Sequence, residues 1–193
     1  MRWLTLYARS RQVPASLAAV VISAVAVWAL AARDGAGGPA DPKLPVFVLF
    51  AGVAAVSIGL GGQDLALDRT AAIRWRPRRA AHVLLGGLLV CAVLLAVQTV
   101  GGEDLATPGF VVRDSAGLMG LAALGAVVCG AAYAWTLPIA WLSFSVFVPP
   151  PTGVPMQAAT WMLLPPGTTT ATWTATTLAI AGTTAYAFAG PRR

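Results

Sequence analysis

The fold is decided by residues 115–148, which read SAGLMGLAALGAVVCGAAYAWTLPIAWLSFSVFV. These 34 residues carry no charge. The run is too long for one transmembrane helix and short for two, since each crossing needs about 20 residues. Aromatic residues and Pro138 predict a tight turn within residues 132–138. The helix from Pro138 to Pro149 would then span roughly 18 Å at about 1.5 Å per residue, less than the hydrocarbon thickness of about 30 Å. Either the turn lies earlier, near Gly130, or the chain does not cross the membrane completely here.

The composition of the whole chain predicts a membrane protein. Hydrophobic residues make up 58% and charged residues 10% of the sequence, and the mean hydropathy is +0.75. Soluble domains carry roughly 25% charged residues, so this chain has too few charges to cover a surface in water. We therefore expect an all-α, polytopic integral membrane helix bundle that forms a single transmembrane domain over residues 1–193. The net charge of +6 is explained by residues between apolar runs, not by nucleic-acid binding.

About six transmembrane helices are predicted from the apolar runs. They cover approximately residues 13–32, 44–61 and 80–100, two crossings within 115–148, and a last crossing over 171–189. Residues 1–12, MRWLTLYARSRQ, predict a short interfacial helix on the cytoplasmic leaflet, the alternative being an irregular basic tail. Residues 149–170 are uncharged and interrupted by prolines, which predicts a re-entrant or external element before the last helix. Glycines of the fourth run, among them Gly117 and Gly120, predict close approach of neighbouring helices.

The basic residues give the predicted orientation. With six crossings and the N-terminus inside, ten basic residues lie on the inner side and three on the outer side, which follows the positive-inside rule. The inner set is Arg2, Arg9, Arg11, Arg69, Arg74, Arg76, Arg78, Arg79, Arg192 and Arg193, and the outer set is Arg33, Lys43 and Arg113. Twelve arginines to one lysine, with much alanine and glycine, are typical of GC-rich bacteria. We expect a multi-pass protein of the bacterial cytoplasmic membrane with both termini in the cytoplasm.

The sequence argues against an enzyme or an ion-coupled transporter. No charged residue falls in the middle of a predicted crossing, where proton relays and ion sites lie. His82 is the only histidine, which is too few for paired haem ligands or a zinc site. Lys43 is the only lysine, and no phosphate-binding loop or serine-nucleophile motif is present. We therefore predict no catalytic residue, cofactor or metal in this chain, and rank a lipid-modifying enzyme last.

Two groups of polar residues are candidate sites within the predicted bundle. Arg113 and Asp114 lie at the outer mouth of the fourth predicted helix, where the favoured interpretation is an interfacial ion pair that caps the helix. The last predicted helix is rich in threonine, and Thr172, Thr176 and Thr183 are candidates for a substrate path. The alternative is that their hydroxyl groups bond to carbonyl groups of their own helix.

Residues 62–79, GQDLALDRTAAIRWRPRR, form the longest charged segment and a predicted cytoplasmic loop. Within it we expect a short helix from Asp64 to Trp75 that is ended by Pro77.

The order of these parts resembles the permease subunit of a bacterial ABC exporter of the drug, antibiotic or lantibiotic type. The segments LDRTAA (67–72), RDSAGLMGLAALGA (113–126), WMLLPP (161–166) and AGPRR (189–193) are similar to those of small actinobacterial permeases.

The resemblance implies ATP-driven export of an apolar or amphipathic substrate (a drug, a peptide or a lipid-like molecule). Its implied partners are an ABC ATPase subunit, which would hold the ATP and Mg²⁺, and a second, identical or different permease subunit. The implied ATPase-docking residues are Asp64, Asp68, Arg69, Arg74, Trp75 and Arg76. The alternative is a non-transport accessory, anchoring or immunity subunit of a larger membrane complex.

Overall fold

The computed structural model describes residues 17–18, 20–22, 25, 43–61, 75–101, 105–149 and 152–192. The principal elements are α3 (Lys43–Ser57), η1 (Ile58–Leu60), α5 (Trp75–Gly101), α6 (Pro108–Val128), η2 (Ala131–Tyr133), α7 (Thr136–Phe147), α8 (Val154–Ala159), η3 (Trp161–Leu163) and α9 (Thr169–Ala189). Over these residues the structure has helices and turns but no strand, which confirms the all-α prediction. The predicted interfacial helix over residues 1–12, most of the crossing over 13–32 and the loop segment 62–74 lie outside the described residues.

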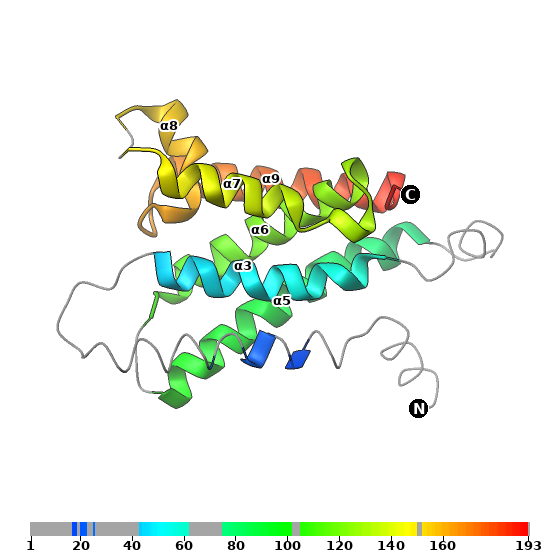
Figure 1. The fold of residues 1–193 in the computed structure, drawn as a ribbon, viewed down its shortest axis with the longest axis horizontal. Helices are drawn as coiled ribbons and strands as arrows, with labels where there is room; N and C mark the ends of the chain where they lie inside the picture. Colours follow the sequence, from blue (N-terminus) through cyan, green and yellow to red (C-terminus); the bar gives the residue numbers. More distant parts are fainter. Residues whose placement is uncertain are drawn as a thin grey trace.

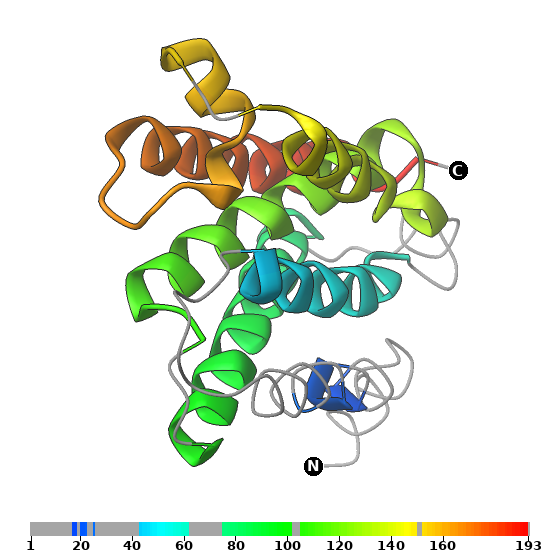
Figure 2. The same ribbon diagram turned by 60° about the vertical axis from the view of Figure 1, so that its left-hand side comes forward.

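Helix α6 is the centre of the bundle. It packs against α3 and α5 on one side and against α7 and α9 on the other (Figure 1). Its contacts show its direction: α5 runs antiparallel to α6, because Gly86 lies near Met119 while Gln98 bonds to Ala106. In contrast, α9 runs parallel to α6, because Gly117 meets Ala175 and Gly120 meets Gly182. The segment containing α8 projects from one end of the α7 and α9 layer (Figure 2).

The closest approach between helices is the crossing of α6 and α9 at Gly120 and Gly182. A Cβ atom added to Gly182 would overlap the backbone of Gly120, and one added to Gly120 would overlap the carbonyl group of Leu178. Such contact requires glycine on both helices, because any side chain would separate them. The tight packing predicted from the glycines of the fourth run is thus found in α6.

Three described segments are long and apolar enough to cross a membrane: Lys43–Leu60, Trp75–Val100 and Pro108–Val128. Helix α9 has 21 residues but is not among them, since its threonines lower its hydropathy. Helix α7 has 12 residues, about 18 Å at roughly 1.5 Å per residue. The structure therefore supports an all-helical chain with three candidate crossings, and the six-helix arrangement stays a prediction.

Two helices begin earlier than the sequence predicted. Helix α6 starts at Pro108, so Arg113 and Asp114 lie inside it and not in the preceding loop. Helix α5 starts at Trp75 and continues through Pro77. The prediction that Pro77 ends a helix is wrong, because a proline in the first turn sacrifices no intrahelical hydrogen bond.

The turn between α6 and α7 also lies earlier than residues 132–138. Helix α6 ends at Val128, and Gly130 has a φ of 99°, a left-handed conformation that favours glycine. The chain then passes close to α6, since a Cβ atom on Gly125 would overlap the carbonyl oxygen of Ala134. The sequence left open an earlier turn, near Gly130, or an incomplete crossing. The structure has the earlier turn, and α7 is still only 12 residues long.

The parallel and antiparallel directions give the bundle two distinct ends. One, the basic end, contains Leu60, Trp75–Arg79, the turn at Gly130 and the last residues of α9 up to Arg192. The other, the proline end, contains the starts of α3, α6 and α9 and the segment 152–168.

Candidate functional site

The proline end is organised around the guanidinium group of Arg113 on α6. Its Nε donates a hydrogen bond to Asp114 Oδ1 over 2.6 Å. Its Nη2 donates to the carbonyl oxygen of Leu164 over 2.8 Å, and its Nη1 donates to that of Pro165 over 3.0 Å. One side chain therefore joins α6 to a segment more than 50 positions away in the sequence.

This ion pair is buried. The side chain of Arg113 is 7% exposed and that of Asp114 is 0% exposed. The guanidinium carbon lies 5.0 Å from the centre of the Phe110 ring, a cation–π contact. Asp114 is the only acidic residue within the described ranges, so the single negative charge there is held by the adjacent arginine.

The pair does not cap α6, contrary to the favoured interpretation of the sequence. The N-cap is Thr107, whose side-chain oxygen accepts a hydrogen bond from the amide group of Phe110 over 3.4 Å, and Pro108 occupies the first turn. Threonine followed by proline is a common helix start because the missing amide hydrogen would have no helical partner. The role of Arg113 is instead to hold the carbonyl groups of residues 164 and 165.

The segment predicted to lie outside, residues 149–170, is anchored to the bundle through residues 159–164, whereas α8 has no buried residue. Trp161 is fully buried, and its ring lies against Gly117, where a Cβ atom would overlap it. The indole Nε1 of Trp141 donates to the carbonyl oxygen of Ala159 over 2.7 Å, which attaches the segment to α7. Thr170 donates to the side-chain oxygen of Gln157 over 3.1 Å, which attaches α8 to α9.

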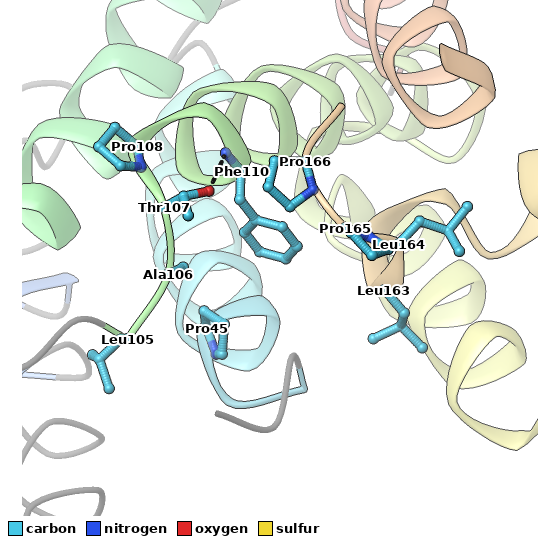
Figure 3. A pocket seen from close by; sticks show the side chains of 10 residues that line it. All are labelled: Pro45, Leu105, Ala106, Thr107, Pro108, Phe110, Leu163, Leu164, Pro165 and Pro166. Atoms are coloured by element: carbon cyan, nitrogen blue, oxygen red, sulfur yellow. Dashed lines mark hydrogen bonds between the residues drawn. The ribbon is translucent and has the colours of Figure 1, made fainter. Parts of the chain in front are cut away.

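A cavity of about 500 Å³ opens at this end, between the start of α3, the start of α6 and the segment after η3. Figure 3 shows the ring of Phe110 directed toward the Leu163–Pro166 side, with Pro45 and Leu105 below it. The lining residues are Pro45, Leu105, Ala106, Thr107, Pro108, Phe110, Leu163, Leu164, Pro165 and Pro166. None is charged, and the volume lies in the range of about 300–1,000 Å³ typical of small-molecule sites.

The basic end contains the predicted docking residues that the structure describes. Asp64, Asp68, Arg69 and Arg74 lie outside the described residues. Trp75 and Arg76 form the start of α5, where the guanidinium carbon of Arg76 lies 4.6 Å from the centre of the Phe188 ring of α9.

Two further contacts join the basic end to α9. The hydroxyl group of Tyr186 donates to the carbonyl oxygen of Leu60 over 2.6 Å in a buried position. Arg79 lies against Gly190, where an added Cβ atom would overlap the guanidinium group. The two flanks of residues 62–74 are therefore both in contact with the end of α9.

The candidate threonines lie along α9 but do not form an enclosed path. Thr172 and Thr176 are exposed, and Thr183 is half-buried in a groove of about 210 Å³ between α5, α6 and α9. The hydroxyl group of Thr172 donates to the carbonyl oxygen of Thr168 over 3.1 Å, as the alternative interpretation predicted for these side chains.

Sequence reasoning missed three residues that organise these ends: Tyr186, Phe110 and Trp161. A tyrosine followed by Phe188 at the end of a helix of small residues was the available signal for Tyr186. Among the residues that the structure describes, no three His, Cys, Asp or Glu side chains gather where they could hold a metal ion.

No family model, curated protein or solved structure matches this chain.

Proposed function

We propose that this chain is the transmembrane permease subunit of a bacterial ABC exporter that moves an apolar or amphipathic substrate. ATP hydrolysis takes place in a separate subunit, and a second permease subunit completes the transporter. Three candidate crossings support this proposal, as does the location of the described charges at the two ends of the bundle. The proposal includes six crossings with the basic end in the cytoplasm, as the positive-inside rule favours.

The observation that carries the proposal is the attachment of both flanks of residues 62–74 to α9. Leu60 precedes the loop and accepts the Tyr186 hydrogen bond, whereas Arg76 follows the loop and stacks on Phe188. A partner that displaces this loop displaces the end of α9 with it, because both flanks move against the same helix.

A contiguous route leads from α9 to the proline end. Helix α9 is in backbone contact with α6 where Gly182 meets Gly120. Two turns earlier along α6, Arg113 holds the carbonyl groups beside the cavity. In the proposed mechanism, ATP-driven motion of the loop shifts α9 against α6 and thereby changes the proline end, a shear motion of packed helices.

The test is recovery of an ATPase with the tagged chain. The chain is solubilised from its native membranes, and co-purifying proteins are identified by mass spectrometry. We expect a nucleotide-binding subunit that is lost when three charged residues of the loop are replaced by alanine. These residues are Asp68, Arg69 and Arg74.

The matched control removes one acidic and two basic residues from the opposite predicted side: Arg33, Asp41 and Lys43 to alanine. It should leave recovery of the ATPase unchanged. A pure membrane complex without a nucleotide-binding subunit would contradict the proposal and favour the accessory or immunity role. Equal loss in both triple variants would contradict the docking role of the loop.

A further inference from the structure

Four oxygen atoms in the walls of the cavity at the proline end accept hydrogen bonds from within the protein. The carbonyl oxygen of Ala106 accepts a hydrogen bond from Gln98 Nε2 over 2.7 Å. The carbonyl oxygens of Leu164 and Pro165 accept from Arg113. The hydroxyl oxygen of Thr107 accepts from the Phe110 amide group, so each of these four oxygens already has a partner within the protein.

Few donors are available on the side of the cavity formed by residues 163–166. Four of the lining residues are proline, which has no amide hydrogen to offer. The amide groups of Leu163 and Leu164 donate to the carbonyl oxygens of Thr160 and Trp161, within their own turn. A ligand with an ionised or strongly polar body would therefore recover only part of its hydration, at a cost of about 1–3 kcal/mol for each group left unsatisfied.

The buried arginine beside the cavity is also paired within the protein. Arg113 lies behind Phe110, with its donors directed to Asp114, Leu164 and Pro165. It holds the wall residues Leu164 and Pro165 in place, and it is not itself among the lining residues. What the cavity does present is aromatic and aliphatic surface from Phe110, Leu105 and the prolines.

The cavity opens where candidate crossings begin, at Lys43 for α3 and at Pro108 for α6. A crossing begins at the boundary between hydrocarbon and headgroups. Molecules dissolved in the apolar part of the bilayer can reach such a position from the side.

From these observations we infer that the cavity at the proline end binds an uncharged small molecule with an apolar, aromatic or aliphatic body. Only the identification of this ligand with the exported substrate rests on the proposed function, and the site itself stands on the geometry of the cavity.

Saturable photolabelling tests this inference. The whole chain is placed in phosphatidylcholine nanodiscs and labelled with an uncharged trifluoromethyl-phenyl diazirine, and labelled peptides are mapped by mass spectrometry. Labelling of residues 105–110 and 163–166 should saturate as the probe concentration rises. Labelling of the exposed face of α5, at Leu84 and Leu88, should rise linearly, as expected for a probe dissolved in lipid. The same diazirine with a sulfonate group should not label the cavity.

A filling substitution gives the decisive comparison. Ala106→Phe puts a ring into the cavity and should reduce saturable labelling by about tenfold or more. Ala181→Phe makes the same change at an exposed position of α9 and should leave labelling as it is in the native chain. If Ala106→Phe does not fold, as judged by thermal unfolding, Leu163→Trp fills the same space.

Linear labelling of both cavity segments, or labelling that the filling variants leave unchanged, would overturn the inference. Loss of the cavity label with the ATPase still recovered would leave the proposed function standing. Saturable labelling without any ATPase partner would support the binding site and contradict the proposed exporter function.

Discussion

The two ends of this bundle use arginine in opposite ways. At the proline end, Arg113 is buried beside Asp114 and directs its donors to Leu164 and Pro165. At the basic end, Arg76 is exposed, and its described contact is a stacking interaction on Phe188. At the proline end, the charged groups therefore bond to each other and to the backbone beside an apolar cavity. At the basic end, the charge of Arg76 is exposed to the surroundings.

The structural means of attachment differ accordingly. The proline end is held by an ion pair and two charge-assisted hydrogen bonds to backbone carbonyl groups. The contacts described at the basic end are the Tyr186 hydroxyl bond, the stacking of Arg76 on Phe188 and a backbone bond from the Arg192 amide group to the carbonyl oxygen of Ala126. Charge-assisted bonds are roughly twice as strong as neutral ones, so we expect the proline end to be the firmer of the two.

The largest effect is expected from Arg113→Ala. This substitution leaves Asp114 buried without its partner and removes both bonds to the segment after η3. Loss of one member of a buried pair costs about 3–5 kcal/mol. Unfolding in mixed micelles, followed by circular dichroism, measures the change in the free energy of unfolding.

Two controls sharpen this test. Arg76→Ala at the exposed basic end should cost about 1 kcal/mol or less, because the charge there is solvated. The double variant Arg113→Leu with Asp114→Leu should be more stable than Arg113→Ala alone, since no buried charge is left. Equal costs for Arg113→Ala and Arg76→Ala would contradict the difference between the two ends.

An intermediate effect is expected at the crossing that connects the ends. Gly182→Ala places a Cβ atom in the backbone of Gly120, and the two helices must separate. We expect a loss of about 1–3 kcal/mol, typical of overpacking. The matched change Gly109→Ala, at a helical position with no atom near the added carbon, should leave stability unchanged or raise it by up to about 1 kcal/mol. The same unfolding measurement tests this prediction. If Gly182→Ala does not change the free energy of unfolding, α6 and α9 are not in direct backbone contact at this position.

The smallest effect is expected from Tyr186→Phe at the basic end. It removes the bond to the carbonyl oxygen of Leu60, a loss of about 0.5–1.5 kcal/mol. Tyr133→Phe is the control, because Tyr133 is 59% exposed and surface changes usually stay within about 0.5 kcal/mol. In a complex with an ATPase, Tyr186→Phe should also weaken the stimulation of ATP turnover by substrate. If the stimulation is unaltered, this would argue against the proposal that α9 moves together with the loop.

Much of the helical layout was predictable from the sequence. The described parts of α3 and α9 agree closely with the apolar runs over residues 44–61 and 171–189. The errors lie where polar residues continue a helix beyond its apolar run, at the starts of α5 and α6. Hydropathy marks where a chain prefers lipid, but backbone hydrogen bonding continues past that boundary, so the first turns were assigned to loops.

The candidate site was predicted only in part. Arg113 and Asp114 were identified as an ion pair because they are adjacent charges beside an apolar run, yet their role as a cap was wrong. Trp161 and Phe110 were not identified as site residues, because an aromatic residue in an apolar sequence gives no sign of what it packs against. The threonines of α9 were identified from composition, and composition does not reveal which of them face a neighbouring helix.

The sequence by itself determined that this protein is all-helical over its described part, that three of these helical segments are long and apolar enough to cross a membrane and that charge is kept near the helix ends. These properties follow from each residue's own preference for water or hydrocarbon, which needs no partner. Only the tertiary structure decided that Arg113 reaches Leu164 and Pro165, and that Tyr186 reaches Leu60 across 126 positions. Such contacts depend on how whole helices pack, and the parallel crossing of α6 and α9 through Gly120 and Gly182 connects the two ends of the bundle.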